Sequence, residues 1–200
     1  MKFLLHDISW RTVHPRTRGF TLVETLAAIT LIMIAIVPPM GLTVQSLSAA
    51  YYARDQITAS NLAQEGIEAV RAVRDGNILA SAESANGGTG TSLFNGIPTD
   101  GSNFRVDGTQ TDPTKIITSC GGGNSPCPAL EINNGVYGYT GNPTNFTRSV
   151  TATVVWSDSG GNAQEISVTS TVVWQTAAYR TQQVQLTEDM FNWPSPGSGT

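Results

Sequence analysis

The chain has 200 residues, of which 40% are hydrophobic and 13% charged, and its formal net charge is -4. This length suggests one domain, and the acidic balance argues against a duplex nucleic-acid surface, which needs clustered Lys and Arg. Both histidines, His6 and His14, lie within the first 19 residues. The rest of the chain therefore excludes a Ser-His-Asp site, a Cys-His site and a His-ligated metal. We expect no enzymatic activity, no catalytic residue, no metal and no cofactor.

The first predicted element is a membrane-length helix that begins near residue 20. The window Arg18-Gly19-Phe20-Thr21-Leu22-Val23-Glu24 leads into an uncharged run from Thr25 to Ala53. A helix over residues 20–44 would span roughly 37 Å, enough for the ~30 Å hydrocarbon core of a bilayer. Pro38 and Pro39 predict a kink or local melting of this helix, because proline lacks the backbone donor. The basic residues upstream favour a cytoplasmic N-terminus: Lys2, Arg11, Arg16 and Arg18.

The window from Arg18 to Glu24 resembles the prepilin cleavage site of type IV pilins and type II secretion pseudopilins. A basic residue and a Gly precede a Phe, and a carboxylate lies four positions after that Phe. The resemblance implies cleavage by prepilin peptidase between Gly19 and Phe20, which removes a cytoplasmic leader of residues 1–19. It also implies N-methylation of the new α-amine on Phe20. An uncleaved single-span anchor is the alternative.

A role for Glu24 follows from the same resemblance. A carboxylate within lipid costs roughly 2.5–3.5 kcal/mol on insertion scales, so it usually has a partner. In the family, the carboxylate of an incoming subunit pairs with the terminal amine of a neighbour and sets the register of assembly. The alternative is a Glu24 side chain that reaches the cytoplasmic interface beside Arg18.

Residues 54–76 are expected to form the amphipathic half of the same helix. Gly76-Asn77 predicts its end, and pairs of Arg71 with Glu68 and Asp75 are expected on its surface. The apolar positions recur every three or four residues and predict a stripe that packs on a β-sheet: Ala59, Leu62, Ala63, Gly66, Ile67, Val70 and Val73.

Residues 77–135 predict a variable loop region, because Gly, Ser, Thr and Asn dominate it and turn signals recur. Short strands are expected at 104–106 and 115–118. Cys120 and Cys127 are the only cysteines. Outside the cytoplasm they should close a disulfide of about 2.5 kcal/mol, whereas two free thiols remain the alternative and a metal site would need two further ligands.

Residues 136–193 predict an antiparallel β-sheet. Two alternating segments flank the turn at 157–162 and should pair Val154 with Ile166, Ala152 with Val168, and Phe146 with Trp174. Trp156 and Trp174 are both expected in the core, on the face that meets the helix. Flanking strands are expected at 136–140 and 183–186, followed by a flexible tail at 194–200.

Together these elements predict an α+β, pilin-like fold: a long N-terminal helix, transmembrane over 20–53 and amphipathic over 54–76, packed on a small antiparallel β-sheet head. The resemblance implies a minor structural subunit of a type IV pilus-like filament or a type II secretion pseudopilus. Its implied partners are the prepilin peptidase/methyltransferase, other pilin or pseudopilin subunits bound through the N-terminal helix, and the assembly platform.

The implied location is a single pass of the inner membrane, with the N-terminus in the cytoplasm and the head outside, and then an extracytoplasmic filament. The alternative is a minor pilin whose 77–135 loops bind a surface or DNA. The acidic chain disfavours DNA, and a membrane-anchored enzyme has the least support.

Overall fold

The computed structural model describes residues 19–83, 92–121, 125–175 and 180–192. The chain divides into two compact units, Met1–Ala49 and Ala50–Thr200. Helix α1 (Leu22–Glu83) contributes to both units, and all β-strands belong to the second, which we call the head unit. The expected leader lies outside the described residues except for Gly19, and so does the expected tail.

Helix α1 continues without a break through Pro38 and Pro39. The local melting expected there is therefore absent, because two missing backbone donors leave the hydrogen bonds of the flanking turns in place. The Thr43 hydroxyl donates to the carbonyl oxygen of Pro39 at 2.9 Å and adds a bond across this turn. The kink at these prolines stays a prediction.

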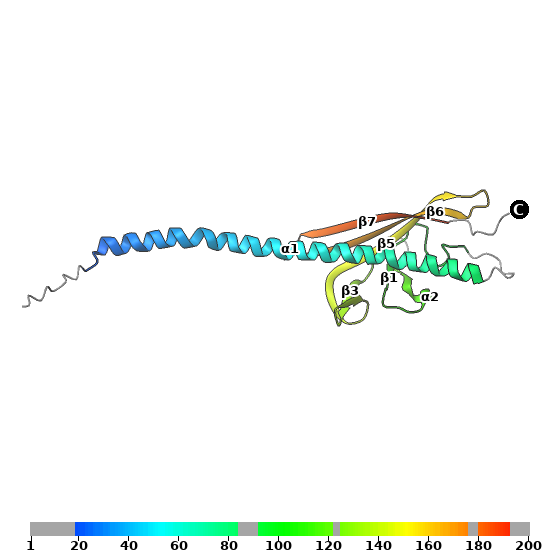
Figure 1. The fold of residues 1–200 in the computed structure, drawn as a ribbon, viewed down its shortest axis with the longest axis horizontal. Coiled ribbons are helices and arrows are strands. Elements are labelled where there is room, and N and C mark those ends of the chain that lie inside the picture. The colour runs from blue at the N-terminus through cyan, green and yellow to red at the C-terminus, as the bar shows by residue number, and fades with distance from the viewer. Residues whose placement is uncertain (1–18, 84–91, 122–124, 176–179, 193–200) are drawn as a thin grey trace, which may run out of the picture. The chain divides into compact units, whose positions relative to one another are not determined.

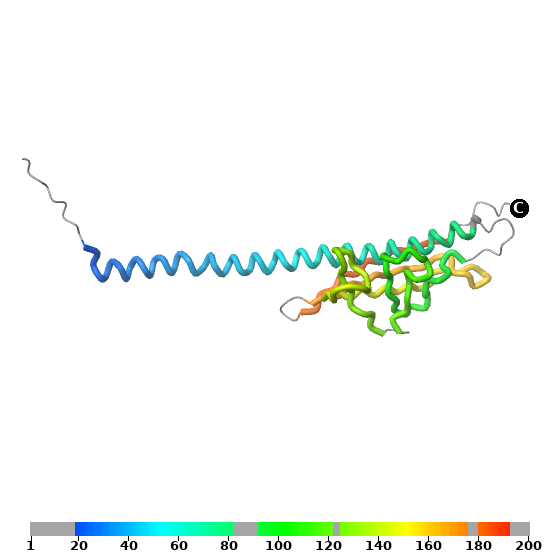
Figure 2. The backbone as a smooth tube through the Cα atoms, turned by 90° about the horizontal axis from the view of Figure 1, so that it is seen from below, coloured from blue at the N-terminus to red at the C-terminus, as the bar shows by residue number. Residues whose placement is uncertain are grey.

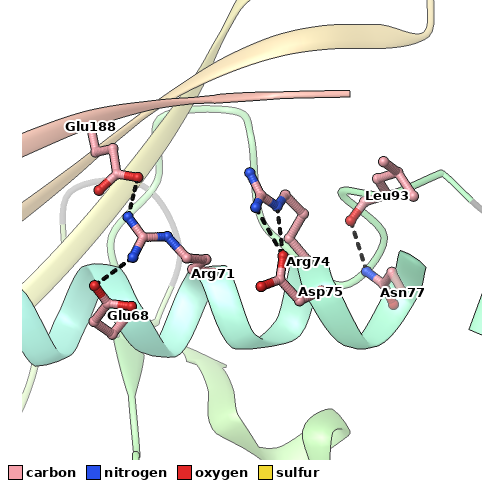
Figure 3. A network of polar contacts seen from close by, with 7 residues as sticks. All are labelled: Glu68, Arg71, Arg74, Asp75, Asn77, Leu93 and Glu188. Atoms are coloured by element: carbon pink, nitrogen blue, oxygen red, sulfur yellow. Dashed lines mark hydrogen bonds and ion pairs between the residues drawn. The ribbon is translucent and has the colours of Figure 1, made fainter. Parts of the chain in front are cut away.

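Helix α1 also passes the stop expected at Gly76-Asn77 and ends at Glu83. The Asn77 side-chain amide donates to the carbonyl oxygens of Leu93 at 2.9 Å and Asn95 at 2.8 Å, and the first of these bonds is drawn in Figure 3. Because this side chain fastens the helix to the following loop, tertiary contacts override the local stop signal.

The head unit contains one antiparallel sheet built around its longest strand, β5. Strand β6 pairs with one edge of β5 and carries β7, while β1 and β3 pair with the other edge and carry β2 and β4 respectively. The strands are β1 (Phe104–Val106), β2 (Ile117–Ser119), β3 (Ala129–Asn133), β4 (Val136–Gly138), β5 (Asn142–Ser157), β6 (Ala163–Gln175) and β7 (Thr181–Phe191).

The sequence located most of these strands but not all of their bounds. Strand β3 was missed, and β7 is longer than the expected 183–186. The expected strand at 115–118 is divided between a short helix, α2 (Pro113–Ile116), and β2. The helix forms because Asp112 caps it through the Thr114 amide at 3.1 Å and Pro113 opens its first turn.

The hairpin of β5 and β6 has the predicted register. Val154 faces Ile166, Ala152 faces Val168, and Phe146 faces Trp174. The expectation that Trp156 lies in the core is wrong: its side chain is 60% exposed. The register shifts between Val154 and Trp156, so one extra residue reverses the alternation and places Trp156 on the opposite face.

The head unit's core lies between α1 and one face of the sheet. Figures 1 and 2 both show the α1 segment of this unit running beside the long strands. The apolar stripe of α1 is buried as predicted, with Val70 and Val73 in one core cluster that includes Val150 and Ile166. A second cluster contains Leu62, Phe146 and Trp174, and the rings of Phe146 and Trp174 lie 6.2 Å apart.

Candidate functional site

The N-terminal end of α1 is capped by its own sequence. The Glu24 backbone N–H donates to the Thr21 hydroxyl oxygen at 3.2 Å, which satisfies one donor of the first turn. Thr21 and Glu24 have the spacing of a capping box, and a carboxylate in the first turn also complements the helix dipole. Our sequence reading missed Thr21, although its spacing from Glu24 was a readable signal.

Gly19 and Phe20 stand together immediately before this cap. Both are exposed, Phe20 at 80%. A Cβ added to Gly19 would meet no other atom within 4 Å. Among the described residues, the packing therefore places no steric demand for glycine at this position.

The first half of α1 presents an apolar surface on every side. Its described side chains are exposed from Leu22 to Ala49. Helix α1 is the one helix in the described residues long and apolar enough to cross a membrane, and the mean hydropathy of an 18-residue window within it is 2.1. Thr25 and Thr30 donate their hydroxyls to carbonyl oxygens of their own helix, each at 2.9 Å. These properties suit a membrane anchor, in which polar groups must find partners within the helix.

Glu24 is the only charged residue from Phe20 to Ala53. Among the described residues, none donates to its carboxylate in the ion pairs or hydrogen bonds of the structure. Its backbone is held by the cap, while its side chain projects from an apolar surface. A carboxylate in such apolar surroundings is costly within lipid and usually has a partner there.

In the head unit, Arg71 joins α1 to the sheet. Its guanidinium bonds Glu68 at 2.5 Å and also Glu188 of β7, as Figure 3 shows. Hydrogen bonding to Glu188 raises the pKa of Arg71 despite partial burial. The expected pair with Glu68 is confirmed, but the one with Asp75 is wrong, because Asp75 bonds Arg74 at 2.9 Å instead.

Arg148 is a fully buried cation on β5. Its guanidinium donates to the carbonyl oxygens of Leu62 at 3.0 Å and Val106 at 2.7 Å, and lies 3.4 Å from a Glu65 carboxylate oxygen. These bonds connect α1, β1 and β5. The sequence analysis did not single out Arg148, although its alternation with Phe146 pointed it inward.

Cys120 and Cys127 form the predicted disulfide, with their Cα atoms 4.9 Å apart. Asn103 anchors this loop beside β1: its carbonyl oxygen accepts from the Cys120 N–H at 3.1 Å, and its side-chain amide donates to the Ser125 carbonyl at 3.2 Å. The described residues contain no group of three or more His, Cys, Asp or Glu side chains that could hold a metal ion.

Comparison with known proteins points to the N-terminal site. A family model described as the prokaryotic N-terminal methylation motif matches residues 14–38. The matched segment contains Gly19, Phe20, Thr21 and Glu24. No curated protein and no solved structure matches the chain.

Proposed function

We propose that this chain is a minor structural subunit of a type IV pilus-like filament or of a type II secretion pseudopilus. It carries the N-terminal methylation motif, which is the hallmark of type IV pilins and pseudopilins. One observation carries the proposal: Gly19, Phe20 and Glu24 stand together at the capped start of an exposed apolar helix. The motif supports a pilin-like or pseudopilin subunit, and the minor rank is our extension.

The first step of this function is cleavage of the Gly19–Phe20 peptide bond by prepilin peptidase, followed by methylation of the new α-amine on Phe20. Removal of residues 1–19 takes away four basic residues, one acidic residue and both histidines. The mature chain then has 7 basic and 14 acidic side chains, a net charge of -7. Within the membrane segment, the one carboxylate and the new amine are the only charged groups.

The second step is assembly through Glu24. An amine and a carboxylate attract each other strongly where the local dielectric constant is low. The carboxylate of one subunit therefore pairs with the Phe20 amine of its neighbour and fixes the register between the two helices. The cap from Thr21 keeps the helix start formed while the carboxylate makes this contact.

The location follows from the same steps. Before assembly, the apolar half of α1 anchors the chain in the inner membrane with its N-terminus in the cytoplasm. After cleavage, the assembly platform adds the subunit to an extracytoplasmic filament, in which the apolar surface packs against other pilin or pseudopilin helices.

The substitution Glu24→Gln separates cleavage from assembly. It should leave the mature N-terminus unchanged, as read by mass spectrometry, but reduce the subunit in sheared filaments at least tenfold. Glu68→Gln, the same change farther along α1, is the matched control and should assemble. Normal incorporation of the Glu24→Gln chain would refute the pairing.

The substitution Gly19→Val tests cleavage by itself. Because open space surrounds Gly19, valine should not disturb the fold, yet it should block the peptidase and leave the full-length chain in the membrane. A Gly19→Val chain processed as efficiently as the natural one would show that the enzyme does not recognise this glycine.

A further inference from the structure

Two adjacent tyrosines and an arginine mark the point where the uncharged run of α1 ends. Tyr51 and Tyr52 stand at the end of the run, and Arg54 is the first charged residue after Glu24. Tyr51 is 58% exposed, Tyr52 is 42% exposed, and the Arg54 side chain is exposed as well. All three residues belong to the head unit.

The packing of the head unit does not account for these side chains. Ala59 is the first buried residue of α1 and lies seven positions after Tyr52, a rise of about 10 Å along the helix. Among the described residues, none forms a hydrogen bond or a ring contact with Tyr51 or Tyr52, and none forms an ion pair with Arg54.

The length of the uncharged run matches the thickness of a bilayer. The run contains 29 residues, counted from Thr25 to Ala53, and a helix of that length rises roughly 43 Å. A bilayer measures about 40–45 Å when both headgroup layers are included. A run of this length reaches from one headgroup layer to the other, so its last residues lie in the outer layer.

The side chains at this end of the run have the chemistry of a headgroup layer. A tyrosine has an apolar ring and a polar hydroxyl, which is why this residue is enriched where membrane hydrocarbon meets water. The Arg54 guanidinium can donate two parallel hydrogen bonds to phosphate oxygens. Because Asp55 follows at once, the segment carries no net charge and does not require an anionic lipid.

The placement of these side chains around α1 favours a surrounding layer over a single neighbouring helix. Successive residues of a helix point about 100° apart, so Tyr51 and Tyr52 face different sides and Arg54 faces a third. One neighbouring helix covers one side, whereas a headgroup layer surrounds the whole circumference. The exposed residues from Leu22 to Ala49 precede this segment on the same helix, so the lipid surface continues into it.

We propose that Tyr51, Tyr52 and Arg54 bind the phospholipid headgroup layer on the outer side of the inner membrane. The two rings lie at the boundary between hydrocarbon and headgroups, and the guanidinium bonds phosphate oxygens. The segment thereby fixes the depth of α1 in the bilayer before assembly. This inference rests on the membrane location in the proposed function, and it adds a contact that neither cleavage nor pairing through Glu24 requires.

The test measures the depth of the tyrosine rings in a bilayer. The full-length chain is labelled with 3-fluorotyrosine and placed in phosphatidylcholine nanodiscs, with a nitroxide either on the lipid headgroup or at the end of the acyl chain. Tyr51→Phe and Tyr52→Phe assign the two fluorine signals. Both signals should be broadened at least twofold more by the headgroup nitroxide than by the chain-end nitroxide. Tyr139, which packs against Arg105 in the head unit, is the reference and should be broadened less by either.

Variants then test whether these side chains set the depth. Tyr52→Leu replaces an interfacial ring with a side chain that prefers hydrocarbon, so the Tyr51 signal should lose at least half of its preference for the headgroup nitroxide. Tyr52→Trp keeps an interfacial ring and should leave that signal unchanged. Arg54→Gln should act in the same direction as Tyr52→Leu. Asp55→Asn is the matched control, because it removes a neighbouring charge but no proposed contact, and it should not shift Tyr51 inward.

Three results would overturn the inference. Stronger broadening of both signals by the chain-end nitroxide would place the rings within the hydrocarbon, and no broadening by either nitroxide would place them beyond the bilayer. Equal Tyr51 signals in the natural, Tyr52→Leu and Arg54→Gln chains would show that these side chains do not set the depth. All three leave the membrane anchor of the proposed function standing, whereas a chain that does not float with phosphatidylcholine vesicles would refute the anchor and this inference together.

Discussion

The substitution Gly66→Ala should destabilise the head unit, although alanine is the better helix former. Gly66 is buried where α1 crosses β5 and β6. A Cβ at this position would overlap the Ser170 hydroxyl oxygen, and it would lie 3.2 Å from Arg148 Cδ and 3.3 Å from Ser170 Cβ. The helix can approach the sheet this closely only because residue 66 has no side chain.

The magnitude follows from two opposing effects. In an open helix interior, alanine in place of glycine stabilises by roughly 0.5–1 kcal/mol. Overpacking a core position costs about 1–3 kcal/mol. Rotation of the Ser170 hydroxyl relieves the worst overlap, but Ser170 Cβ is fixed on β6 and Arg148 is held by two hydrogen bonds. We expect a net loss of about 1–2 kcal/mol.

Gly76→Ala is the matched control in the same helix. A Cβ at Gly76 meets nothing within 4 Å, so this change should stabilise the head unit by about 0.5–1 kcal/mol. Adding Ser170→Gly to Gly66→Ala removes the principal clash and should restore part of the loss. Urea unfolding of the full-length chain in micelles, followed by the tryptophan emission to which buried Trp174 contributes, measures all four proteins.

A Gly66→Ala chain as stable as the natural one would refute the close approach of α1 to the sheet. The same conclusion would follow if Gly66→Ala and Gly76→Ala shifted the unfolding midpoint in the same direction.

Three further outcomes follow from the head unit. Arg148→Ala should lower the free energy of unfolding by at least about 2 kcal/mol, because it leaves a cavity and unpaired backbone carbonyls; urea unfolding measures it. Replacing Cys120 and Cys127 with Ser should cost about 2.5 kcal/mol, the entropy of the opened ring, and a reducing agent should have the same effect on the natural chain only. Burial opposes ionisation of Asp107, but the hydrogen bonds that its carboxylate accepts outweigh this effect and lower its pKa. Hydrogen bonds to the Asp158 carboxylate lower the pKa of that group as well. The hydrogen bonds to these two carboxylates stabilise the folded head unit fully above a pH of about 3.9, the pKa of Asp in the unfolded chain. This stabilisation is lost as the pH falls through the lower pKa values of the folded chain, so the urea midpoint should be level from pH 7 to 5 and drop below about pH 4.

The long hairpin was predictable because its two strands alternate strictly over many residues. With one face buried, a slip of one residue would expose every core side chain, so the pattern determines the register. The extra residue between Val154 and Trp156 was not predictable in this way. A bulge interrupts the alternation, but alternating segments on either side of it look continuous in the sequence.

The N-terminal site and the buried contacts of Arg148 differ in the same respect. Gly19, Phe20, Thr21 and Glu24 are neighbours in sequence, so their spacing alone indicates a function. The contacts of Arg148 come from α1, β1 and β5, and these residues meet only once the strand pairing and the helix packing are known. The pair Gly76-Asn77 shows that a local signal can also mislead. It predicts a helix end, but α1 continues past it because the Asn77 side chain bonds Leu93 and Asn95, a contact that the sequence does not reveal.

The most direct test of the central claim is the N-terminal mass of the chain purified from the membrane of its native cells. The account predicts a protein that begins at Phe20, with a methyl group on its α-amine. A chain that still begins at Met1, in cells whose other prepilins are processed, would contradict it.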